Sequence, residues 1–547
     1  MEEQLWKACS AGNVEEVKQL LQININWQDE LKRTSFYIAS SSSGDIEIVK
    51  LLLNHKRIDI NKATNDGETP LHIACKNGHI DIVKLLLNEE NIDTNKDGRI
   101  GLTPFYSACE KGHIDIVKIL LNDNRVDLNK ALNSGATPFF IACVLGHTDI
   151  VKLLLNDERV DINQANKYSE TPFYVACENG HIEIVKLLLN DKRVDTNKAT
   201  NNEVTPFYIA CQFGYIEIVK LLLNDKRIDL IKTNKWNGST PFFIACEKGH
   251  LEIVRLLLND NRIDINKETT NDSTPFYISC YEGHIEIVKL LLNDIRIDVN
   301  KARINGKTPF FIACENGHIE IVNLLLNDNR VDINKASNDD ETPFYIACSD
   351  GHIDIVKLLL NDERIDINEG NEFDQTPFSK ACDEGHLEIV TLLLNDNRVD
   401  INKAIDSETP FYIACENGHL EVVKLLLNDN RIDINKATND DSTPFLISCY
   451  EGHIEIVKYL LACGREIDIN KKDDEGKTSL DWAREREKME IDEWDEDWEN
   501  EEDFQEIKRN CGKIVKLIEL FEKNPNETRL RLRIQLGLAG KLFIYFF

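Results

Sequence analysis

A cysteine followed four residues later by a histidine recurs along the chain, and this pair is the pattern best suited to chemistry. It occurs in eleven copies, of which Cys177 with His181 is one. Thiolate and imidazole groups bind zinc, but a zinc site needs four ligands at about 2.0 to 2.3 Å and each copy supplies two. One further copy carries Tyr215 at the histidine position. Because tyrosine does not complete a Cys-His set, we interpret the pairs as structural.

A regular repeat positions these pairs. Thr-Pro dipeptides recur about every 34 residues, and they contain twelve of the thirteen prolines. In one copy, Thr171 is suited to cap a helix and Pro172 to occupy its first position, where a missing N–H costs nothing. Gly180 is suited to end that helix, and residues 182–189 form the apolar face of a second one. The polar connector that follows predicts a short hairpin loop.

The helix pair gives each residue of the Cys-His pattern a structural role. Cys177 lies within the first helix, where a small buried thiol fills the place of an alanine. Stacked units about 8 to 10 Å apart place equivalent cysteines beyond the roughly 7 Å that a disulfide allows. We expect redox sensitivity only where one or two copies are exposed. His181 begins the second helix and is suited to cap it or to bond the neighbouring loop.

The pattern T-P-x-x-x-A-x-x-x-G-H-x-x-I-V-x-L-L-L resembles the ankyrin repeat, whose start T-P-L-H stands intact from Thr69 to His72. The resemblance implies an all-α solenoid of about fifteen helix-turn-helix units with short hairpin loops. The sequence differs from the family pattern in its cysteines, in its frequent T-P-F-Y start and in the extra residue of each unit. We expect these divisions: an N-terminal capping repeat at 1–33, thirteen repeats at 34–477, a C-terminal capping repeat at 478–523 with an acidic insertion at about 489–507, and a tail at 524–547.

Composition bounds the class of protein. The 547 residues are 42% hydrophobic and 29% charged, the balance of a folded soluble chain. The net charge of −31 argues against nucleic acid, because phosphate binding needs clustered bases. Fifteen cysteines in a long chain without a basic, then apolar, N-terminus predict reduced thiols in the cytoplasm. The apolar C-terminus is too short to span a bilayer.

Other chemical motifs are missing from the sequence. It has no phosphate-binding loop, nucleophile elbow, zinc-protease or kinase signature. The recurring N-D-x-R-I-D-I-N loosely resembles a calcium loop, but it lacks the glycine and closing glutamate in register. Turn chemistry explains its polar residues more simply. We therefore predict no catalytic residue, no metal and no cofactor.

Recognition is expected where the repeat departs from its own pattern. The residues after the helix-one cysteine are usually polar, but some copies have apolar or aromatic residues there, and two hairpins carry aromatics. By analogy with ankyrin proteins, these side chains are candidate partner-binding anchors on a concave face. Local packing against the adjacent loop is the competing interpretation, and sharing of one patch by Phe213 and Trp236 is a hypothesis. The candidates are Val144, Leu145, Phe213, Trp236, Tyr281, Phe373 and Tyr450.

The C-terminal part differs in kind. Residues 478–491 are expected to form the first helix of the last repeat. Residues 511–523 are expected to form its second helix, delayed by an insertion. Between them, Trp494, Trp498 and Phe504 interleave with acids. This insertion either docks on a basic surface of a partner or of the chain itself, or is a solvated loop with its aromatic side chains against the last repeat. The end of the chain, from Arg529, shows strand-like alternation and has no assigned role.

The resemblance implies a non-catalytic scaffold or adaptor that holds protein partners, and we expect it to be a monomer. A sequestering inhibitor of one partner is a variant of this class. The alternative is a targeting or regulatory subunit of an enzyme complex.

Overall fold

The structure, a computed structural model, describes residues 2–41, 46–405, 407–490 and 501–538. Within these residues it contains 31 helices. No strand is present there, and isolated bridges join only Gln28 to Thr34 and Ile405 to Glu408. The predicted all-α class is confirmed.

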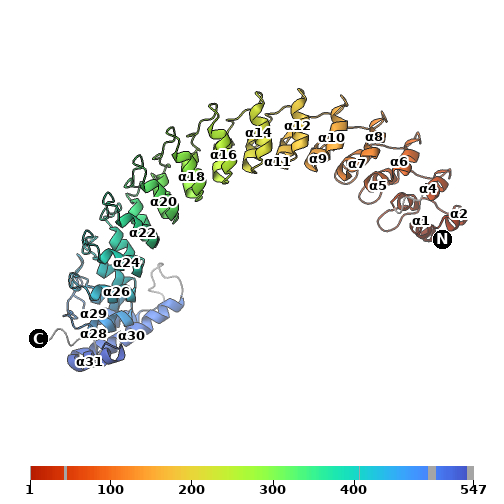
Figure 1. Cartoon of the computed structure of the whole chain (residues 1–547). Coiled ribbons are helices and arrows are strands. Elements are labelled where there is room, and N and C mark those ends of the chain that lie inside the picture. The colour runs from red at the N-terminus through yellow and green to blue at the C-terminus, as the bar shows by residue number, and fades with distance from the viewer. Residues whose placement is uncertain (1, 42–45, 406, 491–500, 539–547) are drawn as a thin grey trace. The chain divides into compact units, whose positions relative to one another are not determined.

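The chain divides into two compact units, residues 1–271 and 272–547, which are described separately. Unit 1 contains sixteen helices in pairs (Figure 1). They are α1 (Glu2–Ser10), α2 (Val14–Leu20), α3 (Ser35–Ser41), α4 (Ile46–Leu53), α5 (Pro70–Asn77), α6 (Ile80–Leu87), α7 (Pro104–Lys111), α8 (Ile114–Leu121), α9 (Pro138–Val144), α10 (Thr148–Leu155), α11 (Pro172–Glu178), α12 (Ile182–Asn190), α13 (Pro206–Gln212), α14 (Ile216–Asn224), α15 (Pro241–Glu247) and α16 (Leu251–Leu258).

Unit 2 continues the pairing and ends in a different arrangement. Its helices are α17 (Pro275–Tyr281), α18 (Ile285–Leu292), α19 (Pro309–Glu315), α20 (Ile319–Leu326), α21 (Pro343–Ser349), α22 (Ile353–Leu360), α23 (Pro377–Asp383), α24 (Leu387–Leu394), α25 (Pro410–Glu416), α26 (Leu420–Leu427), α27 (Pro444–Tyr450), α28 (Ile454–Ala462), α29 (Ser479–Lys488), α30 (Glu501–Lys523) and α31 (Pro525–Gln535).

One repeat shows how the sequence sets these boundaries. The Thr171 side chain accepts a hydrogen bond from the Tyr174 N–H, and Pro172 opens α11. The helix ends before Gly180, whose φ of +75° is a left-handed conformation that glycine adopts without strain. A second helix, α12, then begins after His181. The predicted cap, start and stop are confirmed.

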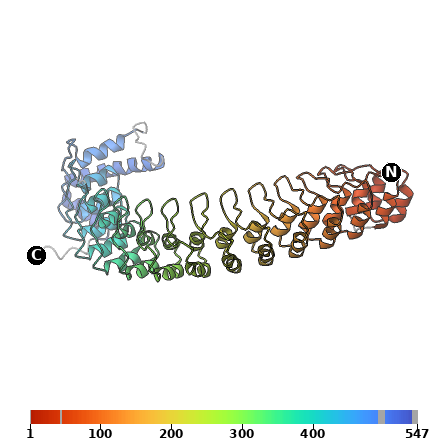
Figure 2. The ribbon, with the colours of Figure 1, turned by 90° about the horizontal axis from the view of Figure 1, so that it is seen from above.

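The core lies between helices of neighbouring repeats. First helices pack against first helices, as α11 does against α9 and α13. In α11 every residue from Pro172 to Cys177 is buried, whereas α12 buries one face, on which Ile184, Val185 and Leu188 lie. In Figure 2 the connecting loops of unit 1 project on the same side of the helices. The first-helix ends and the loop tips therefore remain exposed.

The last repeat of unit 2 has the predicted delayed second helix, but that helix starts earlier than residue 511, where the repeat pattern placed it. α30 packs on α29 and begins at Glu501, so the last part of the predicted acidic insertion is helical. Its apolar stripe explains this start, because Phe504 is buried and continues at helical spacing to Cys511, Ile514 and Ile518. Trp494 and Trp498 lie outside the described residues.

The strand-like alternation from Arg529 is not realised as a strand. Residues 529–535 belong to α31, which Pro525 opens and which packs on α28 and α30, and residues 539–547 lie outside the described residues. Leu, Arg and Gln favour helices, and packing onto two helices buries Leu532 while Leu530 and Ile534 stay exposed. A period of two over a few residues also fits a short helix, so the alternation alone did not decide between a strand and a helix.

Among the described residues, none of the helices combines the length and apolar character needed to cross a membrane.

Candidate protein-interaction surface

The histidine of a Cys-His pair joins its repeat to the preceding one, as His181 shows. The Nε2–H of His181 donates a hydrogen bond to the Val144 carbonyl oxygen at 2.8 Å. The same bond, to the residue after the preceding helix-one cysteine, recurs for His113, His147, His318, His352, His386, His419 and His453. The predicted bond to the neighbouring repeat is confirmed, whereas the side chain of His181 does not cap α12.

The histidine ring also rests on the helix-ending glycine of the preceding repeat. A Cβ atom placed on Gly146 would lie 2.7 Å from the His181 Cε1 atom, and on Gly180 it would lie 2.8 Å from Tyr215 Cε1. Glycine is therefore required both by its φ and by this contact. Tyr215 keeps the ring contact, which explains why it can replace histidine.

The cysteines are core residues, as predicted. Cys177 is fully buried, and burial raises the pKa of its thiol. Fourteen cysteines are buried, Cys463 is half-buried, and none is bridged. Among the described residues no cluster of three His, Cys, Asp or Glu side chains is arranged to hold a metal. The spacing thus serves packing within each repeat and bonding between repeats.

The aspartate of the N-D-x-R segment is engaged by its own arginine. Arg159 Nη2 lies 2.6 Å from Asp157 Oδ2 and donates at 2.7 Å to the Leu121 carbonyl oxygen of the preceding repeat. Bonding to Arg159 is the main cause of the lowered pKa of Asp157. The arginine thus joins the end of one second helix to the loop after the next second helix. This structural role explains why the aspartate recurs in the segment that loosely resembled a calcium loop.

The hairpin tips are closed turns. In the loop before α11, the Ser169 N–H donates to the Asn166 carbonyl oxygen at 2.9 Å, and the Asn166 N–H donates to the Glu170 carbonyl oxygen at 3.0 Å. Ser169 has a φ of +63°. These bonds leave Tyr168, the third residue of the turn, pointing into solvent.

Successive tips are also bonded to one another. The Lys167 N–H donates to the Ser134 carbonyl oxygen of the preceding tip at 2.8 Å, and the Tyr168 carbonyl oxygen accepts from the Asn201 N–H of the following tip at 3.0 Å. The tips of unit 1 therefore form a hydrogen-bonded row that holds exposed side chains in register.

The sequence-predicted anchors of unit 1 occupy two positions. Trp236 lies on a hairpin tip and is 72% exposed. Leu145 and Phe213 cap the ends of α9 and α13 and are half exposed. Val144 is only partly exposed, and its carbonyl oxygen binds His181. The ring of Phe213 stacks on Tyr215 at 6.1 Å, and the structure shows no ring contact between Phe213 and Trp236.

The predicted anchors of unit 2 differ more strongly from one another in exposure and in contacts. Phe373 lies on a hairpin tip and is 68% exposed. Tyr281 is partly exposed at the end of α17, and its carbonyl oxygen accepts from His318. Tyr450 is half-buried and is engaged within the chain, because Trp482 meets it edge-on at 5.1 Å and Arg486 lies 4.0 Å from its ring centre.

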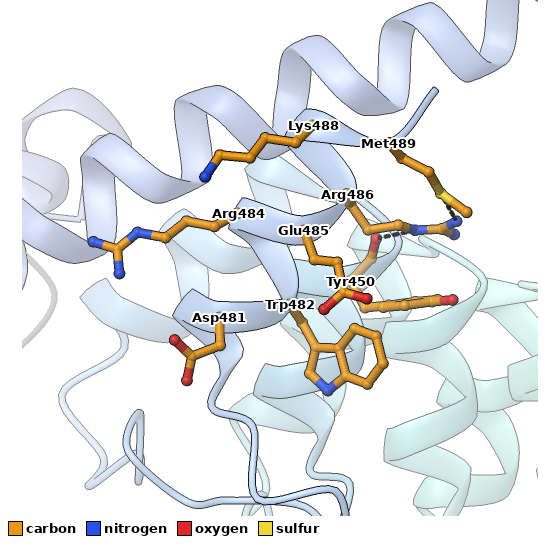
Figure 3. A pocket seen from close by; sticks show the side chains of 8 residues that line it. All are labelled: Tyr450, Asp481, Trp482, Arg484, Glu485, Arg486, Lys488 and Met489. Carbon is orange, nitrogen blue, oxygen red and sulfur yellow. Dashed lines mark hydrogen bonds between the residues drawn. The ribbon is translucent and has the colours of Figure 1, made fainter. Parts of the chain in front are cut away.

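Tyr450 is one of eight residues that line a hollow of about 530 Å³, and Figure 3 shows their side chains. The Nε of Arg486 donates to the Tyr450 backbone oxygen at 3.3 Å. Lys477 lies over Trp482, and the Trp482 Nε1–H donates to Asp473. The contacts of Arg486 and Trp482 with Tyr450 join α29 to α27, whereas Lys477 and Asp473 contact Trp482 from the loop before α29.

Sequence reasoning missed several exposed apolar side chains on the hairpin tips. Leu31, Ile100, Tyr168 and Ile304 are each more than half exposed. With Trp236 and Phe373 they recur every 68 or 69 residues, which is every second repeat. The signal that would have found them is a period of two repeats at the tip, rather than the appearance of aromatics alone.

Paired helices stacked through their first helices and joined by bonded hairpin tips define an α-solenoid repeat protein. The family model described as ankyrin repeats (3 copies) matches residues 5–98, 90–166, 158–234, 228–303, 295–371, 363–438 and 432–491. The chain belongs to the ankyrin repeat family, whose repeats are generally modules for protein–protein interaction. No curated protein matches the chain significantly.

Proposed function

We propose that the chain is a non-catalytic scaffold or adaptor that binds partner proteins through its hairpin tips and first-helix ends. The observation that carries this proposal is the exposure of large apolar side chains at positions that are polar in neighbouring repeats. Trp236 replaces the polar tip residues of adjacent loops, and Phe213 replaces the polar residue that usually follows the first helix.

The energetics favour these side chains as anchors. Exposed aromatic rings are unfavourably hydrated in the free chain. Each contributes about 2 kcal/mol or more to the binding free energy when a partner removes it from water. The tips that carry them are fixed by backbone hydrogen bonds such as Lys235 N–H to the Asn202 oxygen at 2.9 Å. Little ordering is therefore required on binding, which supports affinity.

Differential capture tests the proposal. Proximity labelling is compared for the wild type and the double variant Phe213→Ala/Trp236→Ala, in which both side chains are exposed and folding is expected to be unaffected. Ile295→Ala is the matched control, because Ile295 is 91% exposed but lies in the loop after α18, away from the tips.

We expect a defined set of proteins that the double variant loses and the control keeps. An unchanged set in the double variant, with unchanged circular dichroism, contradicts the proposal.

A further inference from the structure

Three consecutive apolar tips of unit 1 share one arrangement. Each turn opens with a glycine or asparagine, continues with a base and then presents the apolar residue. The apolar residues are Ile100, Tyr168 and Trp236, all more than half exposed.

The base before each apolar residue is held by its backbone. The N–H groups of Arg99, Lys167 and Lys235 donate to the carbonyl oxygen of the preceding tip at 2.7, 2.8 and 2.9 Å. All three residues are exposed. Each base-apolar pair is thus presented from a fixed backbone.

The tips between these pairs have a different character. The two tips between them carry Ser134 and Asn202 at the apolar position, and the tip before Ile100 carries Asp66. Of the other exposed apolar tips of the same period, Leu31 follows Glu30 and Phe373 follows Glu372, whereas Ile304 follows Arg303, which is half-buried. The chain as a whole has a net charge of −31, so three basic residues at the same turn position contrast with its acidic composition.

Contacts within the chain leave these bases available. Arg99 Nη1 reaches Asp66 Oδ1 only at 3.9 Å, and both side chains are mostly exposed. Lys167 Nζ lies 4.9 Å from the centre of the Tyr168 ring, which keeps charge and ring side by side. Such exposed contacts are weak and exchange readily for a partner's carboxylate.

We propose that these three tips form one row that recognises an extended polypeptide segment with an acidic side chain beside an apolar one at each contact. The inference rests on the proposed function and names the chemistry of its partner. Two repeats span about 16 to 20 Å, and an extended chain rises about 3.3 Å per residue. The acidic-apolar pairs of the partner are therefore spaced by five or six residues.

The two parts of each pair have separate effects. The apolar contact provides affinity, whereas the charge pair selects acidic over basic segments and accelerates association. Three linked contacts also raise affinity through effective concentration, which is lost when the partner's spacing does not match.

Synthetic peptides test the row on the full-length protein. The probe is a fluorescent peptide with three Asp-Leu pairs repeated every six residues in a Gly-Ser background, measured by fluorescence anisotropy. Comparison peptides carry Lys-Leu pairs, or Asp-Leu pairs repeated every three residues. A single-stranded oligouridylate tests whether bases and rings bind nucleic acid instead.

The variant Arg99→Glu/Lys167→Glu/Lys235→Glu reverses the three charges. The matched control, Lys118→Glu/Lys152→Glu/Lys186→Glu, makes the same charge change on exposed faces of the second helices of unit 1. We expect at least tenfold weaker binding of the six-residue Asp-Leu peptide in the tip variant and less than a twofold change in the control.

Absence of peptide binding, equal binding of the Lys-Leu or three-residue peptides, equal effects of the two variants, or preferred binding of oligouridylate overturns the inference. If this happens while Phe213→Ala/Trp236→Ala still loses its partners, only the partner chemistry is wrong. If capture is also unchanged, the proposed function fails separately.

Discussion

Glu416 at the end of α25 provides a quantitative test of the electrostatics of unit 2. Burial is the largest cause that raises the pKa of its carboxyl from 4.5 to about 7, and nearby carboxylates add to it. Those carboxylates belong to Glu408, Glu451 and Asp383. The perturbation is Glu416→Gln, which keeps the shape of the side chain and removes its charge.

The sign and size of the stability change follow from the linkage between protonation and folding. A carboxyl with a raised folded pKa stabilises the fold fully below its unfolded pKa of 4.5 and loses that contribution as the pH rises through about 7. The full shift corresponds to about 3.4 kcal/mol at about 1.36 kcal/mol per unit. Because Glu416 is partly solvated, we expect about half, about 1 to 2 kcal/mol. The glutamine variant is therefore more stable than wild type at pH 8 and equal to it at pH 4.5.

Urea unfolding followed by circular dichroism at pH 4.5, 6 and 8 measures this difference, with a nearest-neighbour repeat treatment because such arrays need not unfold in one step. Glu315→Gln is the control. It occupies the same repeat position, but its carboxylate pairs with Lys307 at 2.6 Å, so its loss is expected to destabilise slightly at pH 8. The reasoning is refuted if Glu416→Gln shows no gain at pH 8, or if both variants gain equally.

Two further predictions concern the Cys-His pattern. His181→Ala is expected to destabilise the chain by about 1 to 3 kcal/mol in urea, because it leaves the Val144 carbonyl without its bond, and His181→Tyr is expected to cost less because the ring contact remains; equal costs, or sensitivity of the wild type to a chelator, contradict this role. In the native protein, iodoacetamide is expected to modify Cys463 first, because the other fourteen thiols are buried; peptide mass spectrometry checks the order, and early modification of Cys177 opposes it.

The sequence was sufficient for the repeat architecture because each boundary depends on local chemistry. Thr171, Pro172 and Gly180 act within one helix, so their roles follow from propensity and capping. The partner atom of His181 lies 37 residues earlier in the chain. The position of His181 at the start of a second helix and the resemblance to the ankyrin family suggested a bond to the neighbouring loop, but the partner atom itself required the structure.

The other features of the structure depended on packing between elements that the repeat period does not describe. Tyr450 resembled an exposed anchor because its repeat position is usually polar, but the non-repeating Arg486 and Trp482 cover it. The alternation from Arg529 was equally ambiguous until its contacts with α28 and α30 were seen. The two-repeat period of the tips was present in the sequence, whereas the exposure and fixed backbone of Lys235 and its equivalents required the structure.

Site-specific photocrosslinking in cells tests most directly whether unit 1 binds partner proteins through its tips. A photoreactive residue is placed at Asn202, on the tip next to Trp236, or at Lys152, on the exposed face of α10. We predict discrete protein adducts from position 202 that Trp236→Ala removes, and none of those adducts from position 152. Adducts from position 152 alone, or adducts from position 202 that persist in Trp236→Ala, contradict this prediction.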